Sequence, residues 1–386
     1  MNKKRLVLLI SDISGEAGLG KDAFLVPYLY GKLKDMDVEI ILPYNKDKIL
    51  PQNHRGVKLT ALHFKSNYNC FSFKGEWYFF WYIFRHAPQI DVLMRWHFSY
   101  NTWLIGLLYK LRNKNGYFFI KGDDYGIFKS LLRKNKDPLL PLKNAIIRKI
   151  LQHQCHLADL ITVDNTHFYN ELKNGLFKFS LGDKLKQMIN GFDEETLQQI
   201  GISLKSFDEK ENIMITVGRL GTLQKNTELL LEAIADIDLR EWKVILIGTI
   251  DNRFKTYKKL FFEKFPHLKE KIIFTGAIYD KKDLWEWYNK AKVFVLSSRH
   301  EGYAVVYMEA VRFSNYIVTT DVGGAKDSLR IGNGEIFEQG NKTDLSNKLQ
   351  AIINGETPIK NILAENPVDA YRISWEHEIR CILENN

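Results

Sequence analysis

The stretch SSRHEGYAVVYMEAVRFSNYIVTTDVGGAKD, residues 297–327, carries two glutamates eight positions apart, Glu301 and Glu309. Glu301 follows the apolar run Val293–Leu296, which is typical of a buried strand, whereas Glu309 lies in a segment with helical apolar spacing. The stretch therefore predicts a strand, a turn and a helix. Backbone N–H groups of residues 302–305, at the start of that helix, favour an anion. Because Glu309 can accept hydrogen bonds from a vicinal diol such as ribose, the stretch indicates a nucleotide pocket.

This arrangement resembles the E-x7-E signature of retaining glycosyltransferases of family 4, the group 1 glycosyltransferases, which have the two-domain GT-B fold. The alternative is a solvated loop glutamate and an exposed helix glutamate; the glycine–aromatic step after Glu301 and the residues Thr320–Gly324 favour the resemblance. It implies that Glu301 contacts the donor sugar or offsets positive charge at the anomeric carbon, and that Glu309 holds the ribose. The donor-binding turn between them would comprise Tyr303, Ala304 and Val305.

Length and composition predict a soluble protein of two domains. The chain has 386 residues, a length greater than one hydrophobic core usually supports. Of these residues 45% are hydrophobic and 26% are charged, which is normal for a soluble globular protein. No apolar run approaches the roughly 20 residues that cross a bilayer, and Leu6–Ile10 is better interpreted as a strand than as part of a signal peptide. Three scattered cysteines, Cys70, Cys155 and Cys381, fit a reducing cytoplasm and show no metal spacing. The net charge of +9 favours anionic partners, and no nucleic-acid recognition motif is present.

Strand-like and helix-like segments alternate in both halves of the chain. Such alternation predicts an α/β fold with parallel sheets, here two doubly wound Rossmann-like domains facing across a cleft. Ligands of such sheets bind outside the carboxyl ends of the strands. The expected strands are Leu6–Ile10, Val38–Leu42, Asp91–Met94, Tyr117–Ile120, Leu160–Val163, Gln187–Ile189, Ile213–Val217, Val244–Ile247, Ile272–Phe274, Val293–Leu296, Tyr316–Thr319 and Glu335–Phe337.

The domain boundaries follow from a polar segment in the middle of the chain. Residues 193–211 hold six acids and two lysines, which suits a linker, placed at 194–211. We assign residues 1–193 to an acceptor-side domain and residues 212–371 to a nucleotide-sugar-binding domain. In the GT-B family a C-terminal helix, often opening with Ser-Trp, crosses back to the first domain. The resemblance implies this packing for residues 372–386, and an ordinary terminal helix is the alternative.

Two cations follow the first strand of the second half. Arg219 comes directly after Val217–Gly218, and Lys225 precedes the next helix. A diphosphate leaving group gathers negative charge as a glycosidic bond breaks, and fixed cations would stabilise it. The stretch resembles the G-R-x(n)-K segment of the family, which implies that Arg219 and Lys225 bind the donor diphosphate and act with Glu301 in catalysis. A surface arginine and a helix-start lysine are the alternative, although lysine is disfavoured at a helix N-terminus.

The first half offers a glycine-rich loop. Residues 15–21 match the phosphate-binding pattern G-x-x-x-x-G-K, but Asp22 stands where a serine or threonine would hold magnesium. GT-B enzymes carry a glycine-rich loop here that faces the donor phosphates or the acceptor. We therefore expect Gly18 and Gly20 to allow close backbone approach. A phosphate-transferring NTPase is the alternative function.

The strand over 117–120 ends in Lys121, Asp123 and Asp124, where many family members have a histidine that contacts the donor sugar. We expect Asp123 to lie on the acceptor or donor-sugar side of the site. His97 is a second candidate for that side, and a purely structural role is the alternative for this histidine. Because the histidine of the family is absent at this strand end, a non-catalytic partner subunit is an alternative function for the chain. A sugar-nucleotide epimerase of GT-B architecture is a further alternative. Whether the reaction requires an acceptor substrate distinguishes it from a glycosyltransferase.

By the resemblance, the protein is a hexosyltransferase that moves a sugar from a nucleoside diphosphate donor with retention. It would need no essential metal and no cofactor beyond the nucleotide sugar. The aromatic run Trp77–Phe84 and the basic stretch Lys129–Lys149, with seven Lys/Arg and one acid, suggest a glycan or lipid-linked acceptor at the inner face of an anionic membrane. The expected product is an envelope or capsule-type glycan. Core packing with a solvated basic face is the alternative for both segments.

Overall fold

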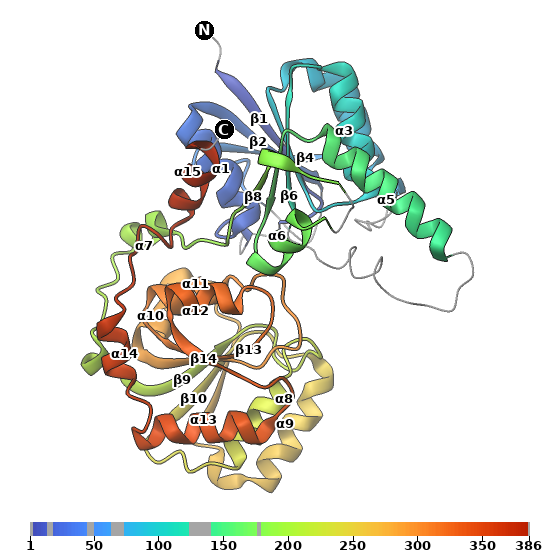
Figure 1. Ribbon diagram of the computed structural model, residues 1–386. Helices are drawn as coiled ribbons and strands as arrows, with labels where there is room; N and C mark the ends of the chain where they lie inside the picture. The colour runs from blue at the N-terminus through green and yellow to red at the C-terminus, as the bar shows by residue number, and fades with distance from the viewer. Residues whose placement is uncertain are drawn as a thin grey trace. The chain divides into compact units, whose positions relative to one another are not determined.

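The computed structural model describes residues 3–13, 18–44, 50–62, 73–122, 140–175 and 179–384 (Figure 1). These residues form two compact units, each built on a mainly parallel sheet. Unit 1 comprises Met1–Ile189 and Trp375–Asn386, and unit 2 comprises Asn190–Ser374. The predicted α/β class with two doubly wound domains is confirmed.

The sheet of unit 1 has the order β3-β4-β2-β1-β5-β6-β7-β8, in which only β3 pairs antiparallel. The chain proceeds from β1 toward β2 on one side and continues from β5 on the other, so the order reverses between β1 and β5. The strands are β1 (Lys4–Leu9), β2 (Met36–Pro43), β3 (Asn53–His54), β4 (Val57–Leu62), β5 (Val92–Trp96), β6 (Tyr117–Gly122), β7 (Leu160–Val163) and β8 (Leu185–Gln187).

Two of these strands correct the sequence analysis. Strands β3 and β4 were not expected, because the residues of β4 alternate between buried and partly exposed near the sheet edge and include the polar Lys58 and Thr60. The strand expected at Gln187–Ile189 lies two residues earlier, as β8.

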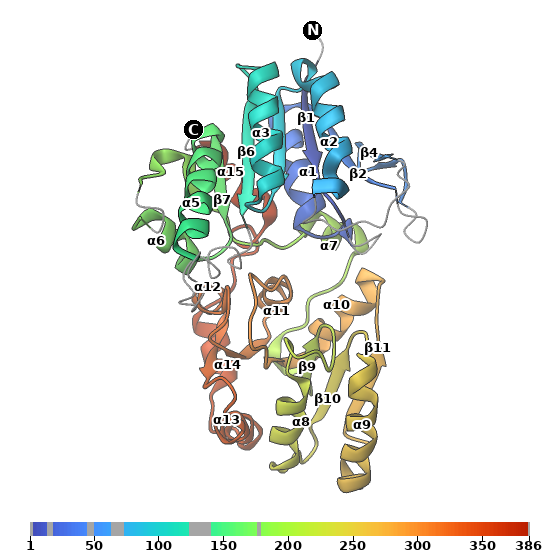
Figure 2. The same ribbon diagram turned by 90° about the vertical axis from the view of Figure 1, so that its right-hand side faces the viewer.

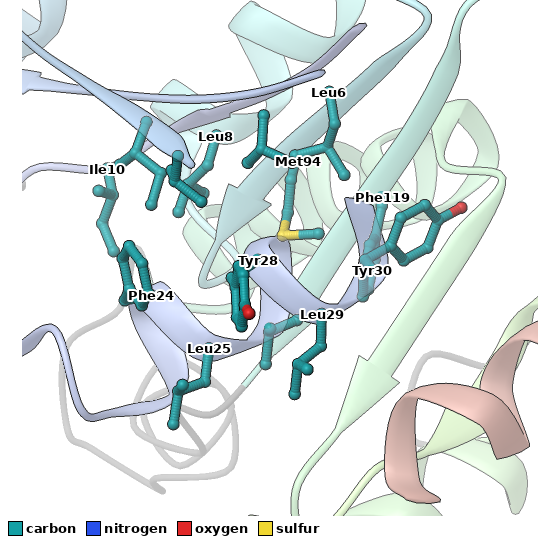
Figure 3. Packing of buried hydrophobic residues seen from close by; sticks show 14 of the residues in the cluster. Leu6, Leu8, Ile10, Phe24, Leu25, Tyr28, Leu29, Tyr30, Met94 and Phe119 are labelled. Atoms are coloured by element: carbon teal, nitrogen blue, oxygen red, sulfur yellow. The ribbon is translucent and has the colours of Figure 1, made fainter. Parts of the chain in front are cut away.

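Helices cover both faces of this sheet (Figure 2). One face packs against α1 (Asp22–Lys34) and α15 (Trp375–Glu384), and Trp375, Ile379 and Ile382 join the same buried cluster as α1. Figure 3 shows this cluster, with Phe24 and Tyr28 of α1 on the side of the helix that faces the strands. The other face packs against α2 (Phe73–His86), α3 (Tyr100–Arg112) and α5 (Leu140–Leu157), and α6 (Thr166–Lys173) follows β7.

The sheet of unit 2 has the order β11-β10-β9-β12-β13-β14 and is parallel throughout. Its strands are near-continuous apolar runs because both faces are covered. The strands are β9 (Glu211–Val217), β10 (Lys243–Ile247), β11 (Ile272–Gly276), β12 (Ala291–Leu296), β13 (Tyr316–Thr320) and β14 (Asn333–Phe337). The helices are α7 (Glu194–Ile200), α8 (Thr227–Ala235), α9 (Asn252–Lys264), α10 (Lys281–Lys290), α11 (Val306–Arg312), α12 (Ala325–Ile331), α13 (Lys342–Asn354) and α14 (Ile359–Glu365).

The segment assigned to the linker contains helix α7. Asp193 caps it by accepting a hydrogen bond from the backbone N–H of Thr196, and Gly201 ends it in a left-handed conformation. Glu194 forms an ion pair with Arg312, so this helix is tied to the rest of unit 2. Within the part of the chain that the structure describes, no helix has the length and apolar character needed to traverse a bilayer.

Candidate functional site

The loops that follow β9 and β12 meet at the point where the strand order of unit 2 reverses. The chain passes from β9 to β10 on one side, and β12 pairs with β9 on the other. Open parallel sheets bind their ligands at such a switch point, outside the carboxyl ends of the strands. Arg219 and Lys225 follow β9, and Glu301 follows β12, so the topology brings all three predicted residues to one edge.

Glu301 lies at the centre of this cluster. Its Oε1 accepts hydrogen bonds from Nζ of Lys225 at 2.7 Å and from Oγ of Ser298 at 2.6 Å. Its Oε2 accepts from Nε2 of Gln224 at 3.1 Å. Three donors therefore fix the carboxylate. The Glu301 side chain is 8% exposed, and the side chain of its partner Lys225 is 14% exposed. Such a pair is strongly oriented because water reaches neither partner freely.

Arg219 joins the cluster through Gln224. The Nη2 of Arg219 donates to Oε1 of Gln224 at 2.8 Å, while the amide group of the same glutamine donates to Glu301. Arg219 is exposed at the carboxyl end of β9 and can meet a ligand there. Gly218 makes room for the lysine, because a Cβ at that position would lie 3.0 Å from Cε of Lys225. The sequence analysis missed Gln224, whose only signal was its place directly before Lys225.

The turn after Glu301 rests on two glycines of the next loop. Gly323 has a φ of +52°, and a Cβ there would lie 2.1 Å from the carbonyl oxygen of Gly302. A Cβ at Gly324 would lie 2.2 Å from the Tyr303 ring. Only glycines allow this close contact between the loops that follow β12 and β13. The predicted turn and helix are confirmed, since α11 starts at Val306.

The remaining residues of this turn are positioned by unit 2 itself. Tyr303 and Ala304 are buried, and the carbonyl of Tyr303 accepts a hydrogen bond from Asn190 at 3.0 Å. Val305 occupies the cap position of α11 with helical backbone angles, and no side chain caps the helix there. No side chain therefore competes with an anion for the backbone N–H groups at this end of the helix.

Glu309 is 5% exposed, accepts two hydrogen bonds from α10 and has the hydroxyl of the buried Tyr288 beside its carboxylate. Its Oε1 accepts from Nζ of Lys281 at 2.7 Å and from Nε1 of Trp285 at 3.1 Å. Burial acts to raise the pKa of Glu309, but the Lys281 ammonium and the Trp285 hydrogen bond hold it below its ordinary value. Both bonds end on Oε1, so a diol would have to approach Oε2. The sequence analysis missed Lys281 and Trp285, which lie one turn apart on α10.

Gly18, Gly20 and His97 lie near the corresponding switch point of unit 1, between β1 and β5. A Cβ at Gly18 would lie 1.3 Å from the carbonyl oxygen of Ile13, so this glycine is required by its own loop. Gly20 is partly exposed. His97 directly follows β5, has a φ of +60°, and donates its backbone N–H to the carbonyl of Lys121. Asp123 lies outside the described residues.

The NTPase alternative receives little support from this loop. Asp22, which stands at the magnesium-ligand position of the phosphate-binding pattern, lies 3.4 Å from Nζ of Lys121. Lys121 is itself 1% exposed and sits over the Trp96 ring at 5.0 Å. Asp22 therefore serves as the partner of a buried cation. Among the described ranges, no three His, Cys, Asp or Glu side chains converge as metal ligands would; metal independence stays a prediction.

The two doubly wound domains have the GT-B fold of known glycosyltransferases. Residues 203–367 match the family described as "Glycosyl transferases group 1", which confirms the predicted resemblance for the segment that holds the site. Membership of family 4 in particular stays a prediction.

Individual relatives agree with this family. The chain is 28% identical over 249 residues to an uncharacterized glycosyltransferase of Methanocaldococcus jannaschii, which is 63% of each chain. It is 26% identical over 223 residues to the amylovoran biosynthesis glycosyltransferase AmsD of Erwinia amylovora, covering 56% of this chain and 59% of that protein. The alignments thus span about three fifths of these relatives. The Anabaena protein HepE, solved in complex with UDP, has the same fold, with a TM-score of 0.67 over 99% of this chain and 98% of that chain at 16% identity.

Proposed function

We propose that this protein is a glycosyltransferase that moves a sugar from a nucleoside diphosphate donor to an acceptor. The observation that carries the proposal is the Lys225–Glu301 ion pair at the switch point of unit 2, joined to Arg219 through Gln224. Two cations and a fixed carboxylate at one sheet edge match what a departing diphosphate and an electron-poor sugar carbon require. The UDP bound to HepE supports the donor class.

Each residue has a defined part in this proposal. Arg219 is exposed and would bind the diphosphate with its planar group of donors. Lys225 would share its ammonium between Glu301 and the phosphates, whose charge grows as the bond to the sugar breaks. Glu301 would face the sugar, since its carboxylate is the negative charge at the centre of the cluster.

The ribose and the phosphates would bind next to the same turn. Glu309 would present Oε2 to the ribose diol while Lys281 and Trp285 hold Oε1. The backbone of Tyr303, Ala304 and Val305, at the start of α11, would meet a phosphate oxygen. Retention of configuration and independence of a metal ion belong to the same proposal, and both are implied by the resemblance to family 4.

The proposed product is an envelope or capsule-type glycan, made in the cytoplasm from a glycan or lipid-linked acceptor at the inner membrane face. The name of the Erwinia relative, a glycosyltransferase of amylovoran biosynthesis, supports a polysaccharide product. The net charge of +9 supports an anionic acceptor or membrane partner. In unit 1, Gly18, Gly20, His97 and Asp123 are the residues proposed for the acceptor or donor-sugar side.

Thermal-shift screening with uridine, guanosine and adenosine diphosphate sugars tests the donor assignment. A ligand at one hundred times its Kd stabilises a protein by about 2.7 kcal/mol, which is readily measured. We expect one nucleotide class to raise the Tm of the wild type, with a smaller shift for Arg219→Gln and Glu309→Ala. Turnover that persists in a chelator and yields the donor's anomeric configuration would support metal independence and retention. If no nucleotide sugar at millimolar concentration shifts the Tm, the proposal is wrong.

A further inference from the structure

Helix α2 of unit 1 is apolar on both sides although it lies at the surface. Its inner side places Phe79 and Ile83 in the core, at 1% and 0% exposure. Helices that are apolar all round are normally buried. The outer side nevertheless carries four aromatic side chains that are 39–47% exposed: Trp77, Tyr78, Trp81 and Phe84. An exposed apolar patch of this kind marks an interaction surface.

Three of the exposed rings, those of Trp77, Trp81 and Phe84, form a continuous row along the helix. The ring centroids of Trp77 and Trp81 are 6.3 Å apart, and those of Trp81 and Phe84 are 5.9 Å apart, both in edge-to-face geometry. The sequence spacings of four and three residues place these side chains on one helix face. Tryptophan and tyrosine combine an apolar body with a polar group and concentrate at membrane–water interfaces.

The helices of this layer expose no carboxylate side chain. Helix α3 packs against both α2 and α5, so that the three form one layer over the sheet (Figure 2). The three helices contain a single acidic residue, Glu76. Glu76 points inward, where it is 4% exposed and lies 2.8 Å from Arg95, which is equally buried. The charge on the outside of the three helices is therefore exclusively positive.

Cations border the aromatic row. The guanidinium of Arg85 lies 5.6 Å from the centre of the Trp81 ring, and that of Arg112 lies 4.9 Å from the centre of the Phe84 ring. Both arginines are exposed, so their guanidinium groups remain accessible to anions beside the rings. We call Trp77, Tyr78, Trp81, Phe84, Arg85 and Arg112 the aromatic–basic face.

We propose that the aromatic–basic face docks on the surface of an anionic lipid bilayer. The aromatic side chains would enter the headgroup region while Arg85 and Arg112 bind lipid phosphates. Charge complementarity selects this partner. A two-fold contact between copies of the chain would set the face against itself, and the same positive charges would repel. The inference deepens the membrane location in the proposed function, but docking requires neither donor nor acceptor.

Vesicle sedimentation with the full chain tests the proposal. We expect binding to phosphatidylcholine vesicles that contain phosphatidylglycerol, little binding to phosphatidylcholine alone, and loss of binding as salt is raised. Replacing both Arg85 and Arg112 by glutamine should weaken binding by about fivefold per arginine. The matched control replaces Lys255 and Lys259, exposed on α9 of unit 2, by glutamine; it makes the same change in net charge and should bind nearly as the wild type.

The aromatic row has its own test. The variant Trp77→Ser with Trp81→Ser should lose most vesicle binding, whereas Leu260→Ser, at a residue of α9 that is 58% exposed, should not. With brominated lipids, part of the tryptophan fluorescence of the wild type should be quenched. A variant with Trp77→Phe and Trp81→Phe should still sediment but lose that quenching. Circular dichroism confirms that each variant is folded.

Three outcomes would overturn the proposal. Equal binding to neutral and anionic vesicles would remove the role of charge. Unchanged binding by the tryptophan or arginine variants would move the contact to another surface. A wild-type dimer in analytical ultracentrifugation that dissociates in the tryptophan variant, without vesicle binding, would assign the face to a second copy of the chain. None of these results affects nucleotide binding by unit 2, so failure here is distinguishable from failure of the proposed function.

Discussion

Nζ of Lys225 lies 2.7 Å from Oε1 of Glu301, although the two residues are separated by 76 positions in the sequence. The side chains are 14% and 8% exposed, so their attraction is stronger than that of a surface pair. If a diphosphate binds at this edge, the same ammonium must serve two anions. The pair therefore links the stability of unit 2 to the chemistry proposed for it.

Replacing Glu301 by glutamine should affect both properties. Lys225 would retain its charge without a carboxylate partner, so we expect the free energy of unfolding to fall by about 1–3 kcal/mol. Turnover at saturating donor should fall by about 10²–10³-fold because the fixed negative charge beside the sugar is lost. Urea unfolding and initial rates measure the two effects. The control is Asp208→Asn, which breaks an exposed pair with Lys360 and should change stability by less than about 0.5 kcal/mol.

A double-mutant cycle separates the pair from its surroundings. Lys225→Met alone should also destabilise unit 2, but combining it with Glu301→Gln should cost less than the sum of the two. Additive effects would show that the two side chains act independently, contrary to the prediction.

Gln224→Glu should weaken donor binding more than Gln224→Met. The wild-type glutamine donates to Glu301 and accepts from Arg219. Methionine removes both hydrogen bonds, whereas glutamate keeps the arginine partner but adds a carboxylate next to Glu301 and to the proposed phosphates. We expect the donor Kd of Gln224→Glu to be about tenfold higher than that of Gln224→Met. The difference between these two Kd values should become smaller in high salt. Calorimetry measures these constants. Tighter binding by the glutamate variant would place the phosphates elsewhere.

Lys281→Met should make stability strongly dependent on pH. In the wild type the pKa of Glu309 is lowered, so its contribution to stability is present above its unfolded-state pKa and is lost as the pH falls through the folded-state value. Without Lys281, only the hydrogen bonds from Trp285 and Tyr288 would oppose burial, which would raise that pKa and penalise the carboxylate. We expect a loss of about 2–4 kcal/mol at pH 8 and a smaller loss at pH 5. Trp285→Phe, which removes one neutral donor, should cost about 1 kcal/mol at either pH. A loss for Lys281→Met that is the same at both pH values would contradict this account.

We expect Glu378 to make the stability of unit 1 depend on pH. Burial raises the pKa of this α15 carboxyl group to about 8, although the backbone N–H of Ile189 donates to it at 3.1 Å and opposes the shift. Because the folded-state pKa exceeds the unfolded one, the contribution to stability is complete below about pH 4.5 and is lost as the pH rises through about 8. Glu378→Gln should therefore stabilise the protein at pH 9, by about 2 kcal/mol, but not at pH 4.

The comparison for this variant is Glu376→Gln, at a partly exposed residue of the same helix that pairs with Arg380. Its effect on the Tm should be small and should vary little with pH. If Glu378→Gln and Glu376→Gln give the same pH profile in thermal denaturation, burial of Glu378 has no influence on its ionisation.

Most of the fold follows from local sequence because the central strands are apolar runs buried on both faces. Strands β9, β10 and β12 each carry a continuous buried stretch, and this pattern identifies them without tertiary information. Strand β4 escapes the same analysis because its outer residues, such as Lys58, are exposed near the sheet edge. Its identity depends on pairing with β2, which no local pattern reports.

The sequence predicts the site residues that a single strand or helix positions, but not the partners that come from other elements. Arg219, Lys225 and Glu301 follow strands, so topology alone brings them together at the switch point. The partners that orient them come from tertiary contacts: Gln224 meets Glu301 from 77 positions away, and Lys281 meets Glu309 from 28 positions away. Nothing in the residues next to Glu309 indicates that a lysine and a tryptophan of α10 will occupy one of its oxygens.

The two ends of unit 2 lie side by side. The backbone N–H of Phe192 donates to the carbonyl of Ile373 at 2.7 Å, and Phe192 also pairs with Ser374 as a parallel bridge. Residues 190–374 thus have the geometry of an inserted cassette, whose removal leaves two neighbouring chain ends to be joined. A cassette with adjacent ends can be exchanged between hosts without stretching either one. Evolution could in this way exchange unit 2 of such a protein for another while unit 1 is left unchanged.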